Sequence, residues 1–461
     1  MRRLVVAVLF AVALSAQAPS PVATNISYAE ASPILDALRD ALPAALRSIT
    51  PAEREAVWPA WVAGRELSIR ERLERGDEDS LVNLLLFGTT FTRQPRAVND
   101  STRLGGRDRA AAIVRGRLSD LVAAIAAPGL DERLQFARLV VDRHGLDPRT
   151  AAGQEAVRRY LVDTVGRTVG EVDSFIRTLQ TAKAQTADVE FAARSTLFHN
   201  RGLSSDTSLL PDYAIDQALA AVANAGTLRP GSVQRIAVIG PGLDFTDKAE
   251  GYDFYPVQTI QPFAIIDSVV RLGLANAPGL RVTAFDVSPR IIRHLETARE
   301  RAQSGAGYVV HLPWDPDGMW SENLIAYWKR FGDQIGAETT PVAPPPEAGT
   351  VQVRAVRVRP SVVLGVVPDS LNIVLQRLHP MSDDDHFDLV IASNIFVYYD
   401  VVEQALALAN VAAMLRPGGV LLSNNSLPAL PATALRVAGS TGVVYSRRPD
   451  DSDRVVWYQR Q

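Results

Sequence analysis

The chain has 461 residues, of which 47% are hydrophobic and 21% charged, an ordinary globular composition long enough for two or three domains. The formal net charge of −3 gives no reason to expect a nucleic-acid partner. The chain contains no cysteine, which excludes disulfides, thiolate metal sites and cysteine nucleophiles. The six histidines include no pair at metal-ligand spacing, so we expect no histidine-based metal site.

Residues 1–18 are predicted to be a secretory signal or a membrane anchor. Arg2 and Arg3 precede an apolar run from Leu4 to Leu14, and small residues follow up to Ala18, which is the order of a signal peptide. Pro19 directly after the expected cut hinders cleavage, so the segment could remain as an anchor. We therefore expect a periplasmic, secreted or anchored protein. The alternative is a mis-assigned start or a buried helix, which would leave the protein in the cytoplasm.

An all-α N-terminal domain is predicted for residues 24–225. Apolar residues recur at helical spacing from Ile34 to Leu46, and the capping box from Thr50 to Glu53 starts a new helix. Further helical patterns cover residues 107–126, 131–144, 151–166, 169–184 and 211–225. The polar segment 194–202 either connects the two domains or lies over the pocket of the second one.

From residue 226 to residue 461, strands and helices alternate, which predicts a parallel sheet. The predicted strands are 236–239, 282–285, 371–378, 389–392 and 420–423, and the predicted helices are 263–272, 288–303 and 401–415. Residues 314–350 interrupt this order as an insertion with a proline-rich linker at 341–346. Two short β-rich runs, 442–446 and 454–459, predict a terminal hairpin.

Candidate ligand-binding residues follow the predicted strands. Gly240 and Gly242 would let the backbone approach a ligand, although a tight strand-to-helix turn explains them equally well. Asp286 ends a strand where a carboxylate can accept both hydroxyl protons of a ribose, and a helix N-cap is the alternative role. Asn394 and Phe396 suit a flat base, a sulfonium ion or a substrate chain, while a core position is the alternative for Phe396.

These motifs resemble those of class I S-adenosylmethionine-dependent methyltransferases. The region from about Arg235 to Ser426 is most similar to the chemotaxis-receptor (protein-glutamate) methyltransferase catalytic domain. The likeness lies in the glycine turn, in Phe285-Asp286-Val287, in Ser393 to Tyr399 and in the Leu-Arg-Pro-Gly-Gly turn from Leu415. It implies an α/β, Rossmann-like methyltransferase domain with a terminal β-hairpin, preceded by the all-α domain, and S-adenosyl-L-methionine as the cofactor.

The resemblance also implies roles for single residues. Gly240 and Gly242 would lie against the methionine part of the cofactor, and Asp286 would bind the ribose hydroxyls. Asn394 would lie beside the transferring methyl group, and Tyr398 would line the methyl path by packing rather than by proton transfer. The predicted set is therefore Tyr398 as the catalytic residue, with Gly240, Gly242, Asp244, Asp286, Val287, Asn394 and Phe396 binding the cofactor.

Two functions follow from these patterns. The first is methyl transfer from S-adenosylmethionine to an acceptor that the sequence does not identify. The alternative is an exported, catalytically silent binding or scaffold protein on a methyltransferase fold, because the cofactor is made in the cytoplasm and several motif positions depart from the family. One such departure is Asp244, which replaces the third glycine of the turn. A nicotinamide-dependent oxidoreductase is disfavoured, because Gly240 and Asp286 are much farther apart than the roughly 20 residues of a dinucleotide fingerprint.

Overall fold

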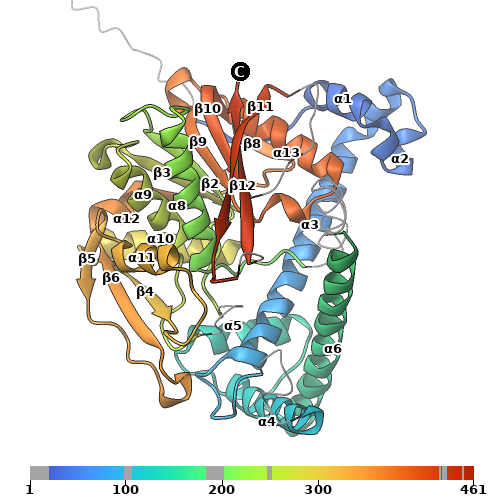
Figure 1. Cartoon of the computed structure of the whole chain (residues 1–461). Helices are drawn as coiled ribbons and strands as arrows, with labels where there is room; N and C mark the ends of the chain where they lie inside the picture. Colours follow the sequence, from blue (N-terminus) through green and yellow to red (C-terminus); the bar gives the residue numbers. More distant parts are fainter. Residues whose placement is uncertain are drawn as a thin grey trace, which may run out of the picture.

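A computed structural model of the chain describes residues 20–97, 106–182, 202–246, 252–424, 427, 433–448 and 451–461. The predicted signal or anchor segment, residues 1–18, lies outside these ranges. Among the helices within them, none is long and apolar enough to cross a membrane. A twisted sheet occupies the centre of the molecule and helices surround it (Figure 1).

The central sheet has seven strands, and five neighbouring ones are parallel. In spatial order these are β10 (Leu415–Ser423), β9 (Phe387–Ala392), β2 (Arg235–Ile239), β3 (Arg281–Asp286) and β7 (Val366–Ser370). β12 (Ser452–Arg460) pairs antiparallel with β10, and β11 (Leu435–Val444) pairs antiparallel with β12 at the sheet edge. The chain runs outward from β2 to β7 and then returns to β9 on the other side of β2. The carboxyl ends of β2 and β9 therefore form the topological switch point, where open α/β sheets bind ligands.

The side chains of β2 point alternately to the two faces of the sheet, and both faces are buried. Ile236 and Val238 share a core cluster with α8 (Leu209–Asn224), α9 (Gln261–Arg271) and α10 (Pro289–Gln303). Ala237 and Ile239 share the other cluster with α13 (Val401–Met414). This period of two is what a strand covered on both faces requires.

An insertion between α10 and β7 forms a small antiparallel sheet of its own. Its strands are β4 (Tyr308–Trp314), β6 (Gln352–Val358) and β5 (Gly336–Thr339), in that spatial order, with α11 (Glu322–Arg330) between β4 and β5. The proline-rich residues 341–346 connect β5 to β6, and α12 (Pro360–Gly365) leads into β7. The insertion is therefore longer than the predicted range 314–350, because β4 begins before that range and β6 follows it.

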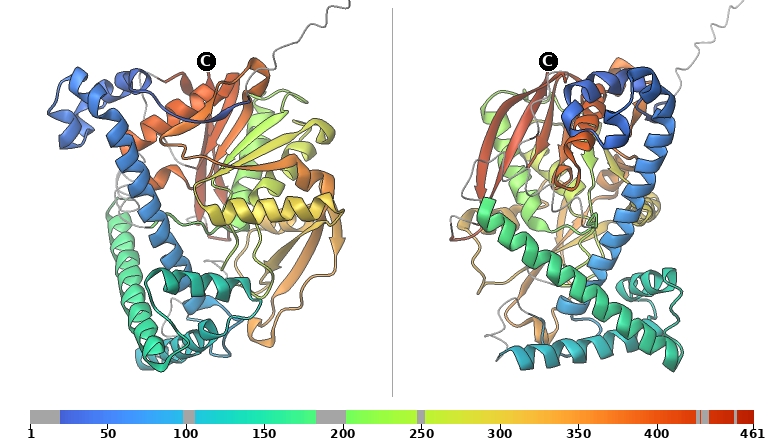
Figure 2. Two further views of the ribbon diagram at one scale, coloured as in Figure 1. Left: turned by 180° about the vertical axis from the view of Figure 1, so that it is seen from behind. Right: turned by 90° about the vertical axis from the view of Figure 1, so that its right-hand side faces the viewer.

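Helices fill most of the N-terminal part and line one flank of the molecule (Figure 2). After β1 (Val22–Asn25) come α1 (Tyr28–Ala37), α2 (Ala44–Arg47), α3 (Pro51–Phe87), α4 (Arg107–Ala126), α5 (Glu132–Arg143) and α6 (Ala151–Ala182). α3 begins at the predicted capping box, where the Thr50 N–H donates to the Glu53 carboxylate at 2.8 Å. Short 3₁₀ turns occur at η1 (Arg39–Ala41), η2 (Ala277–Gly279), η3 (Pro346–Ala348), η4 (Asp383–Asp385) and η5 (Phe396–Tyr398).

The helical part and the sheet part are packed together. Leu81, Leu84 and Leu85 of α3 belong to the same hydrophobic cluster as Ile236 of β2. The buried Arg72 of α3 also pairs with Glu403 of α13 at 3.1 Å. α3 therefore holds a fixed position beside the carboxyl end of the sheet.

Two sequence predictions of local structure are wrong. Residues 371–378 are not a strand of the main sheet, because that place belongs to β7, and only β8 (Gln376–His379) is extended, paired with β1. The apolar side chains from Leu371 to Leu375 are buried beneath the sheet edge instead. The helices predicted at 151–166 and 169–184 form the single helix α6, since Gly166 and Gly170 are tolerated inside it.

Candidate functional site

A recess lies at the switch point, beside the carboxyl ends of β2, β3 and β9. Its cavity volume is about 60 Å³, within about 520 Å³ of recess that opens to solvent. The walls are mostly apolar and come from α3, from the strand ends and from two connecting segments. They are made by Leu73, Leu203, Ser204, Ser205, Ile239, Gly240, Gly242, Phe285, Asp286, Val287, Leu371, Ile373, Ile395, Tyr398 and Tyr399.

The glycine turn after β2 forms one wall. Gly240 and Gly242 have φ angles of 66° and 67°, which a residue with a Cβ adopts only at a cost. A Cβ on Gly240 would collide with Cδ1 of Ile395, and a Cβ on Gly242 would lie 3.0 Å from Cβ of Thr207. Both glycines are therefore needed for the turn and for close packing by this chain's own side chains.

Asp286 lines the same recess as Gly240, at the end of the neighbouring strand β3, and is only 7% exposed. Its Oδ1 accepts the Ser288 N–H at 2.7 Å. Burial raises the pKa of Asp286 to about 7, and the Ser288 N–H and the nearby Arg290 guanidinium partly oppose this rise. The N-cap of α10 is Ser288, so the alternative role of Asp286 as the helix cap is not observed.

Arg290, in the first turn of α10, carries a buried cation near the Asp286 carboxylate. Its guanidinium lies 4.0 Å from carboxylate oxygens of Asp77 and of Asp206, and 4.0 Å from the ring centroid of Phe136. Burial lowers the pKa of Arg290, and the acidic neighbours oppose this. The result is a charged cluster that joins α3 and α10 next to the recess.

A connecting segment, residues 202–207, covers the glycine turn, and we call it the strap. The Leu243 N–H donates to the Ser205 carbonyl at 2.8 Å, and the Thr207 N–H donates to the Leu243 carbonyl at 2.8 Å. At its other end the Leu203 N–H donates to the Arg72 carbonyl at 2.8 Å. Sequence reasoning missed the strap and Leu73, because both reach the recess through contacts that no local pattern signals. For the polar segment 194–202 the sequence leaves two alternatives, a connection between the domains or a place over the pocket, and residues 194–201 lie outside the described ranges.

Val287 and Tyr398 of the predicted set also line the recess. The Tyr398 carbonyl accepts a hydrogen bond from Nη1 of Arg72 at 2.8 Å, which anchors the turn after β9 to α3. The adjacent Tyr399 is 4% exposed, and burial raises its pKa, so its hydroxyl stays protonated at neutral pH. The structure thus brings together Gly240, Gly242, Asp286, Val287 and Tyr398.

Asp244, Asn394 and Phe396 of the predicted set do not line the recess. Asp244 pairs with Gln258, whose Nε2 donates to Oδ2 of Asp244 at 2.8 Å. Asn394 is exposed with a φ of 57°, and its N–H donates to Oδ1 of Asn424 at 2.7 Å, which ties the ends of β9 and β10. Phe396 is fully buried in the core beneath the turn, the alternative left open for it.

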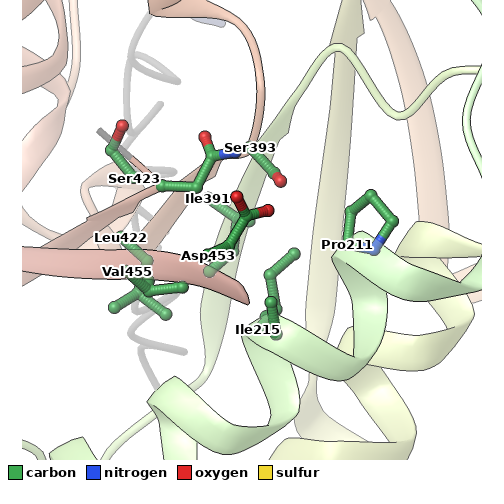
Figure 3. Close-up of a pocket in the computed structure, with 10 residues that line it drawn as sticks. Pro211, Ile215, Ile391, Ser393, Leu422, Ser423, Asp453 and Val455 are labelled. Carbon is green, nitrogen blue, oxygen red and sulfur yellow. The ribbon is translucent and has the colours of Figure 1, made fainter. Parts of the chain in front are cut away.

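A second pocket lies between the start of α8 and the ends of β9, β10 and β12 (Figure 3). Polar side chains of Ser393, Ser423 and Asp453 surround it, and the Asp453 carboxylate accepts the Tyr445 hydroxyl at 2.8 Å. Its cavity volume of about 10 Å³ holds about one water molecule. The recess is therefore the stronger candidate for a ligand. Among the described residues, no group of three or more acidic or histidine side chains could hold a metal ion.

No protein-family model matches the sequence, and no curated protein matches it. Among solved structures, the chain is similar to magnesium protoporphyrin IX methyltransferase (ChlM) from Synechocystis PCC 6803 with bound SAM, at 11% identity, 55% of this chain, 81% of that chain and a TM-score of 0.26. TrmN from Thermus thermophilus matches at 15% identity over 55% of this chain and 53% of that chain, with a TM-score of 0.25. The O-methyltransferase NcsB1 from neocarzinostatin biosynthesis matches at 11% identity over 86% and 96%, with a TM-score of 0.26. Superpositions this loose carry no argument about activity.

Proposed function

We propose that this chain binds S-adenosylmethionine in the recess and transfers its methyl group to an acceptor. The observation that carries the proposal is that the buried Asp286 lines one recess together with Gly240 and Gly242, at the switch point of a parallel sheet. The seven-stranded sheet with its five parallel strands fits the Rossmann-like architecture that the sequence resemblance implies, and the terminal hairpin of that architecture belongs to this proposal. The finer likeness to chemotaxis-receptor methyltransferases, and with it a protein carboxylate as acceptor, belongs to this proposal.

The chemistry of the residues fits an adenosyl ligand. Asp286 supplies acceptor oxygens for ribose hydroxyls, and Phe285, Leu371 and Ile373 supply apolar surface for a flat base. The cavity volume of about 60 Å³ fits an adenosyl ligand least well, because ligand pockets usually measure roughly 300–1,000 Å³. Because the Ile395 side chain lies against Gly240, we expect it to turn away when the ligand enters.

When bound, the cofactor would supply both the methyl group and its sulfide leaving group, so no nucleophilic serine or cysteine is required. The task left to this chain is to orient the ligand and exclude water. Tyr398 lines the recess after β9 and would pack along the methyl path, while the strap and Leu73 would close the recess from above.

Calorimetric titration with S-adenosylmethionine tests the proposal. We expect saturable heat at submillimolar cofactor, and release of S-adenosylhomocysteine once an acceptor is supplied. Folded protein that gives no heat at millimolar cofactor would refute the enzyme function.

That negative outcome would favour the alternative, an exported and catalytically silent binding or scaffold protein. The small cavity and the contact between Ile395 and Gly240 are the observations that favour it. Two further proposals belong with either function. Residues 24–225 would act as a helical domain that shapes access, next to the methyltransferase-like domain 226–461. Residues 1–18 would direct export or anchor the chain, which cell fractionation and sequencing of the mature N-terminus would check.

A further inference from the structure

The strap carries a buried hydroxyl that the fold leaves unused. Ser205 is 6% exposed and lines the recess, and within the described part of the chain its Oγ has no hydrogen-bond partner. A buried hydroxyl without a partner loses its hydrogen bonds to water and gains none in return, so such groups usually have a ligand or water to bond. The neighbouring Ser204 differs, because its Oγ accepts the Asp206 N–H at 3.3 Å.

The position of Ser205 is fixed relative to the glycine turn. Its carbonyl accepts the Leu243 N–H at 2.8 Å, and this carbonyl oxygen would lie 3.1 Å from a Cβ on Gly242. Asp286 lies at the end of the neighbouring strand, in the same recess. A ligand whose ribose meets Asp286 and whose other end follows the glycine turn would therefore bring that other end to Ser205.

We propose that Ser205 binds the amino-acid end of the cofactor, donating its hydroxyl to the carboxylate or accepting from the ammonium group. This inference rests on the proposed function and adds a contact from the strap, outside the sheet and its motifs. It makes the strap part of the binding site and gives it a specific ligand chemistry, a zwitterionic amino acid attached to adenosine.

The test compares two probes that differ only in this end of the ligand. S-adenosylhomocysteine carries the amino-acid part, whereas 5′-methylthioadenosine keeps the adenosine and the sulfur but lacks it. Ser205→Ala should weaken binding of S-adenosylhomocysteine about three- to tenfold, as expected for one lost hydrogen bond, and leave binding of 5′-methylthioadenosine unchanged. Ser208→Ala is the matched control, since Ser208 follows the strap, makes no side-chain cap bond and does not line the recess.

The outcomes separate the two proposals. Equal affinity of wild type and Ser205→Ala for S-adenosylhomocysteine would overturn the role of Ser205 while leaving the proposed function intact. Equal weakening of both probes would also overturn it, because it would indicate a structural effect on the strap. Failure of the wild-type protein to bind either probe would remove the proposed function, and this inference with it.

Discussion

Asp286→Asn should change ligand binding and protein stability in opposite directions. The amide keeps an oxygen that can accept the Ser288 N–H, so the local backbone bond at 2.7 Å is preserved. The substitution removes the negative charge and one of the two acceptor oxygens. Because hydrogen bonds to a charged group contribute about 1.5–3 kcal/mol each, losing the ribose interaction should weaken S-adenosylhomocysteine binding roughly 100-fold.

The stability effect follows from the pKa of about 7 that burial gives Asp286. Between about pH 4 and pH 7 the unfolded chain has lost this proton and the folded protein keeps it, so the contribution to the free energy of unfolding falls as the pH rises through that window. At about 1.4 kcal/mol per pKa unit, the cost of the buried carboxyl grows by about 3 kcal/mol between pH 5 and pH 8. Asp286→Asn should therefore gain stability relative to wild type by about that amount over this range.

Urea unfolding of both proteins at pH 5, 6, 7 and 8, followed by tryptophan fluorescence, measures the difference. Wild-type binding of S-adenosylhomocysteine should also weaken about tenfold from pH 8 to pH 6, as Asp286 takes up its proton. Asp369→Asn is the matched control for ligand binding, because Asp369 lies in the neighbouring strand β7 and does not line the recess. A stability difference between wild type and Asp286→Asn that does not change with pH would refute the reasoning about burial. Unchanged ligand affinity in the variant would refute the ribose assignment.

Three other substitutions test the walls of the recess and its support. Ile395→Ala removes the side chain that lies against Gly240, so it should tighten S-adenosylhomocysteine binding about threefold or more in calorimetry. The same substitution should lower the free energy of unfolding by about 2 kcal/mol. Weaker binding would contradict the expected movement of Ile395. Gly242→Ala places a Cβ on a residue with a φ of 67° and against the strap. The substitution should therefore lower the free energy of unfolding by about 1–2 kcal/mol in urea titrations. An unchanged unfolding midpoint would contradict this. Arg72→Ala leaves the fully buried Glu403 carboxylate without its nearest cation and should cost about 3 kcal/mol, measured as a lower urea midpoint that Arg72→Lys partly restores.

The sheet could be predicted because its signals are local. The runs that became β2, β3 and β9 are mostly apolar and end in or before a glycine or polar residue, as buried parallel strands do. β7 escaped prediction because Pro368 lies within it, and proline is compatible with a strand only at a sheet edge such as this one. The apolar residues that follow β7 have the composition of a buried strand because they are buried in the core, where Leu371 and Ile373 also line the recess.

The site could be predicted only where it follows the strands. Asp286 and the glycine turn are placed by the sheet itself, so their convergence follows from strand order. Asn394 and Phe396 also come shortly after β9, but in the turn Asn394 bonds to Asn424 and Phe396 is buried in the core. Those side-chain directions depend on backbone angles within a single turn, which residue types at a given spacing do not specify.

The features of the recess share an energetic property that bears on its role. The buried carboxyl of Asp286, the conformational entropy that two glycines lose in their turn, and the Ser205 hydroxyl, which has no hydrogen-bond partner among the described residues, each oppose folding when considered alone. They come from three separate parts of the chain and meet within one cavity. Locally unfavourable choices that converge on one place are typical of binding sites, because a ligand supplies the partners that the fold leaves out. A purely structural recess would give no reason for all three costs to gather there.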